Sequence, residues 1–371
     1  MKLIFASDSL KGSLSSEETA SLLTKAAREV FSECEYIGVP VADGGEGTVD
    51  AVIEALNGER ITTTVHDPLM NEIQASYGVA GKKAIIEMAA ASGLTLVPEE
   101  SRNPLNTTTY GTGELIRDSL DHSCRELYIA IGGSATNDGG MGCLRALGAK
   151  FLDKNGSELT GCGRDLADVA FIDLGGLDNR LLQSKITVLC DVKNPLCGEH
   201  GATYTYAKQK GANPAMIELL ESGMRNYRDV IQRQFGVDCD TVEGAGAAGG
   251  LGAALKVFLN AEMQSGIEAV LNLIGFDELI EGADLIVTGE GRADAQSLCG
   301  KVMQGVGLHA KAKGIPAVGL CGSIADGAEQ LYNCGVTALY SLVDEHTSLE
   351  EAITNAERVY YEAAVRMLRK L

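Results

Sequence analysis

Short apolar runs alternate at both ends of the chain with longer segments in which apolar residues recur every three or four positions. Residues 2–6 predict a buried strand, because β-branched and aromatic residues follow one another there. A helix is expected from about Glu17, since Ser15 and Glu18 have the spacing of a capping box. The order of strand, small-residue turn and helix returns from residue 283. This alternation predicts a parallel sheet with helices on both faces.

Further helices are expected from the same periodicity. They lie at residues 113–120, 214–235, 250–259 and 301–313. A last helix is expected after Ser348, with Glu351 completing its capping box and an apolar face that continues to Met367.

The middle of the chain has a different pattern. Residues 61–65 and 75–79 alternate between apolar and polar side chains, which predicts short antiparallel strands, and Asp67-Pro68 marks a turn between them. We therefore predict an α/β fold with two α/β domains. A doubly wound, Rossmann- or flavodoxin-like parallel sheet is formed by residues 1–60 plus 281–371, and residues 61–280 form an inserted mixed-sheet α/β domain.

Composition and charge narrow the class of protein. The chain has 371 residues, 45% of them hydrophobic, and a formal net charge of −20. Nucleic acid and anionic membrane surfaces are unexpected partners, because both repel a chain of this charge. No apolar run approaches the length that spans a bilayer. The cysteines are scattered singly, which favours reduced thiols and a cytoplasmic protein.

Acidic residues follow the predicted strands, each with a glycine or another small residue nearby. They are Asp8, Asp43, Asp138, Asp191, and Glu290 with Asp294. In open α/β sheets, ligands bind outside the carboxyl ends of the strands. Crowded carboxylates repel one another unless a cation or a shared proton is present. Mg²⁺ bound by carboxylates together with substrate phosphates would neutralise this repulsion. The alternative is that these residues only cap helices and form turns.

Glycine clusters and nearby cations suit an anionic ligand. Residues 132–142 precede a predicted helix, where free backbone N–H groups can hold a phosphate. Lys11 lies between a strand end and a helix start, and Arg292 lies in a strand-end loop. Each of these cations can bind carboxylate or phosphate, although a solvated surface position is the simpler interpretation of either one alone.

Searches for other catalytic motifs exclude several classes. The P-loop pattern and the Gly-x-Ser-x-Gly pattern are both absent. Residues 244–249 match G-x-G-x-x-G, which keeps a nicotinamide-dependent hydroxy-acid oxidoreductase as an alternative, but no clear strand precedes them. A ligand sensor that binds a small acid without catalysis is a second alternative, and it does not explain the acidic residues at the strand ends.

Several blocks of sequence together resemble the type 1 glycerate kinases. They are SDSLKGS (7–13), ADGGEGT (42–48), EMAAASGL (87–94), NPL (103–105), TTTYG (107–111), GGSATNDGG (132–140), CDV (190–192) with NPL (194–196), residues 244–252, and TGEGR (288–292). The blocks cover essentially the whole chain in order.

The resemblance implies a kinase that phosphorylates D-glycerate with ATP and Mg²⁺. The product expected from the bacterial branch is 2-phosphoglycerate, with 3-phosphoglycerate the less expected product, in glyoxylate and sugar-diacid breakdown. The resemblance also implies that one α/β domain is inserted in the other, with the active site in the cleft between them. A homo-oligomer is compatible with this expectation.

Roles for individual residues are a hypothesis built on phosphoryl transfer, which needs positioning and neutralised charge. The catalytic candidates are Asp191 as general base, Asp43 as second choice, and Lys11 and Arg292 as cations. The candidates for holding substrate or phosphate are Asp8, Ser9, Gly44, Gly45, Glu46, Gly132, Gly133, Ser134, Asn137 and Asp138. Glu290 and Asp294 are the candidates for Mg²⁺.

Overall fold

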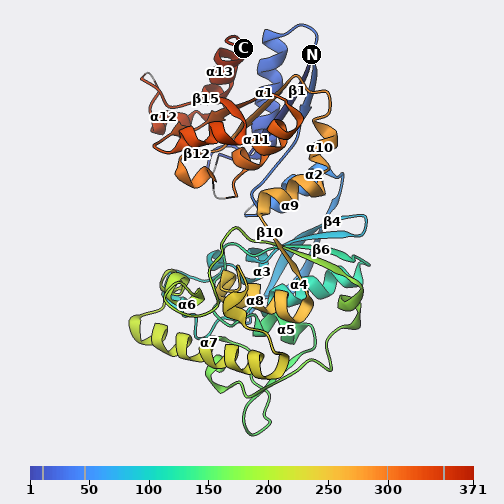
Figure 1. Ribbon diagram of the computed structural model, residues 1–371, viewed down its shortest axis with the longest axis vertical. Helices are drawn as coiled ribbons and strands as arrows, with labels where there is room; N and C mark the ends of the chain where they lie inside the picture. The colour runs from blue at the N-terminus through green and yellow to red at the C-terminus, as the bar shows by residue number, and fades with distance from the viewer. Residues whose placement is uncertain (11, 46, 299, 346) are drawn as a thin grey trace. The chain divides into compact units, whose positions relative to one another are not determined.

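The computed structural model describes residues 1–10, 12–45, 47–298, 300–345 and 347–371 (Figure 1). The chain divides into two compact units. The first unit comprises Met1–Asn57 with Ser265–Leu371, and the second comprises Gly58–Gln264. Within the described ranges, no helix is long and apolar enough to cross a membrane.

The first unit is built on a parallel sheet with the strand order β2-β1-β11-β13-β15. Counted along the chain, this order is of the 2-1-3-4-5 type found in flavodoxin-like folds. Its strands are β1 (Lys2–Ser7), β2 (Glu35–Gly38), β11 (Leu285–Gly289), β13 (Ala317–Cys321) and β15 (Val336–Ser341). A separate parallel pair joins β12 (Arg292–Ala293) and β14 (Ser323–Ile324). The helices are α1 (Ser16–Val30), α2 (Thr48–Ala55), α9 (Gly266–Leu273), α10 (Phe276–Leu279), α11 (Val302–Lys313), α12 (Leu349–Thr354) and α13 (Ala356–Leu368).

Helices cover both faces of this sheet because the side chains of β1 alternate between two apolar clusters. Leu3 and Phe5 pack in a cluster with residues of α1 and α13. Ile4 and Ala6 pack in a second cluster with residues of α9, α10 and α11. The predicted doubly wound α/β class is therefore confirmed for this unit.

The predicted helix starts are confirmed at α1 and α12, whereas the last helix differs from the prediction. Ser15 and Glu18 form the expected capping box of α1. The Ser348 hydroxyl accepts a hydrogen bond at the start of α12, but the helix ends after Thr354 and α13 begins separately. Glu351 does not complete a box there, because its carboxylate pairs with Arg358 at 2.7 Å.

The second unit contains a mixed sheet with the strand order β10-β9-β6-β5-β4-β3. Its strands are β3 (Glu59–His66), β4 (Glu72–Ala80), β5 (Lys83–Glu87), β6 (Glu126–Ala130), β9 (Lys185–Leu189) and β10 (Glu262–Gln264), and β7 (Lys150–Leu152) pairs separately with β8 (Phe171–Asp173). The helices are α3 (Ala89–Ser92), α4 (Tyr110–Asp121), α5 (Met141–Ala146), α6 (Ala202–Tyr206), α7 (Pro214–Phe235) and α8 (Ala247–Leu259).

The direction of the strands in the second sheet follows the sequence pattern. The predicted antiparallel pair is confirmed as β3 and β4, in which Thr63 lies opposite Ala75. The pairs from β5 through β6 and β9 to β10 are parallel. Tyr77 of β4 is fully buried in the main apolar cluster of this unit, as expected for the inward face of an alternating strand.

The chain returns to the first unit at Ser265, earlier than the position 281 expected from the sequence. The reason is packing. Ile267 and Leu271 of α9 and Phe276 of α10 are buried in the same apolar cluster as Ile4 of β1. Residues 265–280 therefore belong to the first unit.

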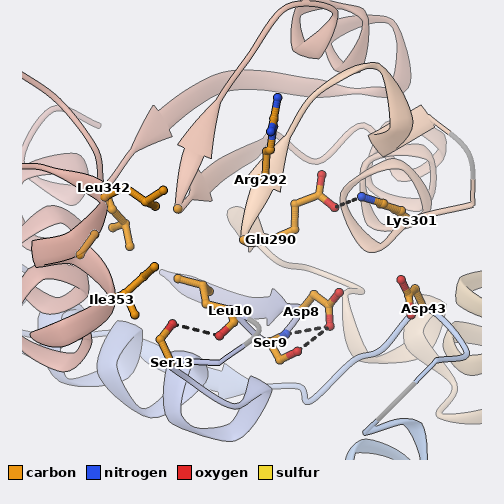
Figure 2. Close-up of a pocket in the computed structure, with 14 residues that line it drawn as sticks. Asp8, Ser9, Leu10, Ser13, Asp43, Glu290, Arg292, Lys301, Leu342 and Ile353 are labelled. Carbon is orange, nitrogen blue, oxygen red and sulfur yellow. Dashed lines mark hydrogen bonds and ion pairs between the residues drawn. The ribbon is translucent and has the colours of Figure 1, made fainter. Parts of the chain in front are cut away.

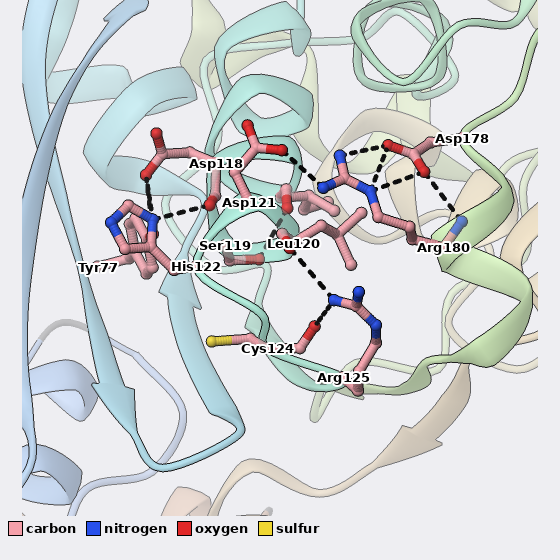
Figure 3. A network of polar contacts seen from close by, with 11 residues as sticks. Tyr77, Asp118, Ser119, Leu120, Asp121, His122, Cys124, Arg125, Asp178 and Arg180 are labelled. Atoms are coloured by element: carbon pink, nitrogen blue, oxygen red, sulfur yellow. Dashed lines mark hydrogen bonds and ion pairs between the residues drawn. The ribbon is translucent and has the colours of Figure 1, made fainter.

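A polar network fixes the C-terminal end of α4 in the second unit (Figure 3). The Tyr77 hydroxyl donates to the Asp118 carboxylate at 2.8 Å. Arg180 binds both Asp121 and Asp178, at 2.6 and 2.7 Å. Burial, followed by the hydrogen bond to Asp118, raises the pKa of Tyr77, so the phenol stays protonated as a donor. The network ties α4 to the sheet and to the segment before β9, which is a structural role.

Candidate functional site

A pocket of about 330 Å³ lies in the first unit, lined by residues that follow the carboxyl ends of its parallel strands (Figure 2). Asp8 follows β1, Glu290 follows β11 and Leu342 follows β15. The chain adds β2 on one side of β1 and adds β11 and the later strands on the other side, so the topological switch point of the sheet lies between β1 and β11. Ligands of open α/β sheets bind at such points.

Asp8 and Ser9 form the floor of this pocket next to the end of β1. The Asp8 backbone N–H donates to the Gly289 carbonyl oxygen at 2.9 Å, which extends the pairing of β1 with β11 by one residue. The Ser9 backbone N–H donates to Asp8 Oδ1 at 2.7 Å and holds the carboxylate in place. Asp8 is 8% exposed. Both residues therefore lie after the end of β1 and line the pocket.

Asp43 lines the same pocket from the loop after β2. Its Oδ1 accepts a hydrogen bond from the Gly45 backbone N–H at 3.1 Å, and Gly44 has the left-handed φ of 84°. A Cβ on Gly266 would lie 1.9 Å from the Asp43 carbonyl oxygen, so the start of α9 can approach this loop only because residue 266 is glycine. The loop that carries Asp43 is thus held by one side-chain hydrogen bond and one close backbone approach.

Glu290 is a buried carboxylate of the pocket with a raised pKa. It is 3% exposed, and its buried Oε1 has no hydrogen-bond partner in the described part of the chain. The pKa of Glu290 is raised to about 7, mainly by burial and also by the charges of Asp8 and Asp294, while Ser297 and Lys301 act in the opposite direction. Lys301 Nζ lies 3.9 Å from Glu290 Oε2. A cation close to Glu290 would stabilise the ionised carboxylate against the penalty of burial.

Arg292 and Lys301 place positive charge at the pocket. The Arg292 side chain is 66% exposed, and its Nε lies 3.2 Å from Asp294 Oδ2. Lys301 lines the pocket beside Glu290. Both groups are accessible from the pocket, so both can bind an anionic ligand.

The described carboxylates fit Mg²⁺ only in combination with a ligand. In the described ranges, no group of three or more His, Cys, Asp or Glu residues is placed to hold a metal ion. Mg²⁺ keeps several waters and is usually bound by one or two carboxylates together with substrate phosphates. Glu290, with its unpartnered buried oxygen, and the neighbouring Asp294 fit such an ion.

The glycine-rich segment 132–140 follows β6 in the second unit. Gly132 and Gly133 are exposed, whereas Ser134 and Asn137 are buried. The Asn137 Oδ1 atom is buried without a partner among the described residues, although its amide donates to Thr203 at 3.2 Å. The exposed glycines are thus the part of the segment whose backbone is open to a ligand.

Asp138, which was expected to bind substrate or phosphate, is oriented inward. It is fully buried, and one oxygen accepts from the Thr109 backbone N–H at 2.7 Å and the Thr109 hydroxyl at 2.8 Å. The backbone N–H groups of Gly140 and Gly142 also donate to its carboxylate. Burial raises the pKa of Asp138 and these donors lower it. Asp138 therefore holds the turn together from inside.

Lys210 is a residue that the sequence did not indicate. It is 2% exposed, and its ammonium donates to the Ser134 hydroxyl and to the Thr136 carbonyl oxygen, both at 2.7 Å. Burial lowers the pKa of Lys210 to about 7, which the nearby Asp138 only partly offsets. Lys208 precedes it in the same short turn and is exposed. Nothing in the local sequence separates the buried lysine from the exposed one.

Asp191 follows β9 and is exposed. Ala130 of β6 is paired with Leu189 of β9, so Gly132 and Asp191 each lie two residues beyond a paired position at the same edge of the second sheet. The structure therefore brings Asp191 and the start of the glycine-rich segment to one edge, as the strand-end pattern predicted.

The G-x-G-x-x-G segment serves packing. A short 3₁₀ turn, Cys239–Thr241, precedes it in place of a strand. A Cβ on Gly249 would lie 2.1 Å from the Thr136 carbonyl oxygen, and the Gly249 carbonyl oxygen accepts from the Gly139 N–H at 2.9 Å. The segment thus supports the turn at 132–140, and the structure offers no dinucleotide fingerprint there.

Two of the expected site residues, Lys11 and Glu46, lie outside the described residues. The others fall into two groups. The pocket of the first unit is lined by Asp8, Ser9, Asp43, Glu290 and Arg292. Gly44, Gly45 and Asp294 are close in sequence to these lining residues. Gly132, Gly133, Ser134, Asn137, Asp138 and Asp191 follow neighbouring strands of the second unit.

Comparison with known proteins gives one consistent result. The model of the glycerate kinase family matches residues 3–371. A glycerate 2-kinase of Escherichia coli (strain K12) is 48% identical over 358 residues, covering 96% of this chain and 94% of that protein. A glycerate kinase of Bacillus subtilis (strain 168) is 45% identical, covering 99% and 96%. A crystal structure described as glycerate kinase 2 from Salmonella typhimurium LT2 superposes with a TM-score of 0.91 at 43% identity, covering 100% and 98% of the two chains.

Proposed function

Because the chain belongs to the glycerate kinase family, we propose that it transfers the terminal phosphoryl group of ATP to D-glycerate, releasing ADP and 2-phosphoglycerate. The observation that carries the proposal is the pocket at the switch point of the first unit. Carboxylates and cations line it together, which is the charge pattern that a phosphorylated nucleotide with a divalent cation requires. The oxidoreductase alternative has no comparable support, since its glycine motif is used for packing.

In this reaction the glycerate C2 hydroxyl oxygen forms a bond to the terminal phosphorus, the bond from that phosphorus to the bridging oxygen breaks, and ADP leaves. The hydroxyl proton passes to a carboxylate. Asp191 is the proposed base because it is exposed at the sheet edge beside the open glycines, and Asp43 is the second choice.

The cations and the metal ligands have supporting roles. Arg292 and Lys301 bind the carboxylate of glycerate or the phosphates, and the exposed N–H groups of Gly132 and Gly133 bind anionic oxygens. Glu290 and Asp294 would hold Mg²⁺, which neutralises phosphate charge when it is bound. Lys210 holds Ser134 and Thr136 in the shape that leaves the glycines open.

The place of the reaction in metabolism is part of the same proposal. A kinase that makes 2-phosphoglycerate passes its product to the dehydration step that forms an enol phosphate. We expect the glycerate to come from a reductive step on a three-carbon oxo acid, as in glyoxylate and sugar-diacid breakdown.

The direct test is ADP release from Mg-ATP with D-glycerate, with L-glycerate and no acid as controls. The product is then incubated with enolase, which consumes only 2-phosphoglycerate, and no mutase is added. ADP that depends on D-glycerate and a product that enolase consumes support the proposal. A product that needs the mutase would refute 2-phosphorylation, and no acid-dependent ADP from folded protein would refute the kinase assignment.

The base assignment is tested by Asp191→Ala, with Glu199→Ala as the matched control because Glu199 is an exposed carboxylate of the same unit. Loss of a general base lowers kcat by about 10²–10⁴-fold. Near-normal kcat in Asp191→Ala would move the role to Asp43.

A further inference from the structure

The pocket of the first unit has two chemically different sides (Figure 2). Asp8, Glu290 and Lys301 form the charged side. Opposite them, Leu342 and Ile353 show only apolar atoms to the pocket, and Leu10 lies between the two sides. A ligand that fills this pocket therefore needs both a charged part and an apolar part.

The apolar side is formed mainly by one helix. Leu349, Ala352 and Ile353 of α12 lie at positions i, i+3 and i+4 and so share one face of the helix, which we call the α12 face. Ala352 is packed into the core, but Leu349 is 58% exposed and Ile353 is 53% exposed. Two large aliphatic side chains are thus left uncovered at the rim of a charged pocket.

D-Glycerate does not account for the α12 face. It is a three-carbon acid with two hydroxyl groups, and every one of its carbons carries oxygen, so it has no apolar surface to bury against leucine and isoleucine. A pocket of about 330 Å³ also lies in the range that holds much larger ligands. A nucleotide meets both requirements, because it joins a flat base with apolar faces to a polyanion.

We propose that the α12 face is the binding site for the adenine base of the nucleotide, which packs on Leu349 and Ile353 while its phosphates extend toward Arg292 and Lys301. The inference rests on the proposed kinase function and adds the location of the base. The charges agree with this orientation of the nucleotide, since Lys301 lies on the side of the pocket away from the α12 face.

The test replaces each exposed side chain of the α12 face with a carboxylate, as Leu349→Asp and Ile353→Asp. Leu308→Asp is the matched control, because Leu308 is an aliphatic residue of α11 in the same unit, 42% exposed and outside the pocket. Binding of ADP is measured by titration calorimetry without glycerate, and KM is measured separately for ATP and for glycerate.

We expect the Kd for ADP and the KM for ATP to rise about tenfold or more in both α12 variants, because a base that packs on apolar side chains loses that burial. The KM for glycerate and all values for Leu308→Asp should stay within about twofold of the wild type. Inorganic tripolyphosphate, which has no base, should inhibit the wild type and the α12 variants with the same constant.

The failures of this inference and of the proposed function are distinguishable. If glycerate-dependent ADP release persists but ADP affinity is unchanged in both α12 variants, the base lies elsewhere and the kinase assignment stands. If the variants raise the KM for glycerate or weaken tripolyphosphate as much as ATP, the α12 face does not bind the base. If the wild type neither binds ADP nor releases it with glycerate, the proposed function itself is wrong.

Discussion

The buried Lys210 should make the stability of the second unit depend on pH, and Lys210→Met should remove that dependence. Its ammonium is enclosed against Ser134 and Thr136, and Asp138 is the charged group that acts on it. Methionine has a similar length and no charge, so the substitution deletes the titrating group without leaving a large cavity.

The sign follows from proton binding in the two states. Burial lowers the pKa of Lys210 from 10.5 to about 7, so between these values the unfolded chain binds a proton that the folded chain does not. Stability therefore rises with pH across this window. From about pH 6 to about pH 9, the contribution of Lys210 to the free energy of unfolding should become about 2–3 kcal/mol more favourable.

The free energy of unfolding is measured at several pH values by urea denaturation followed by circular dichroism. Hydrogen exchange of peptides from β6 and β9 reports on the second unit alone. The difference between wild type and Lys210→Met is used because it cancels other titrating groups. Lys208→Met, at an exposed position of the same turn, should remain parallel to the wild type. If the wild-type and Lys210→Met curves are also parallel, the lysine is not held as a desolvated cation and the reasoning is refuted.

Two further predictions concern the first unit. His309 lies 3.3 Å from Glu268 and 2.8 Å from Asp277, and the two carboxylates raise its pKa to about 9. His309→Gln should lower the free energy of unfolding by about 1–2 kcal/mol below about pH 6.5, a figure reduced because both carboxylates are about half exposed. This loss should vanish as the pH rises through about 9. Thermal unfolding at both pH extremes measures the loss, and an equal loss at both would contradict the prediction. Gly266→Ala should displace the Asp43 backbone, lower the free energy of unfolding by about 1–3 kcal/mol and reduce glycerate turnover. Unchanged steady-state kinetics would disprove the link between the position of Asp43 and turnover.

Much of the fold was predictable because it is encoded by neighbours in the sequence. The α1 capping box needs only Ser15 and Glu18, and α7 spans the residues 214–235 that the helical period predicts. The antiparallel pair β3 and β4 follows from alternation over a few residues. The strand-end carboxylates Asp8 and Glu290 were also predictable, since parallel strands bring their carboxyl ends to one edge.

The tertiary structure decided what the local pattern leaves open, namely which polar groups are buried and what they face. Asp138 and Asp8 both follow a strand and look alike in the sequence, yet Asp138 is enclosed by donors from Thr109 and Gly140, whereas Asp8 reaches a pocket. Lys210 became a buried cation because the turn at Ser134 folds over it. Burial and pKa depend on contacts between residues far apart in the chain, and no periodicity within a segment encodes them.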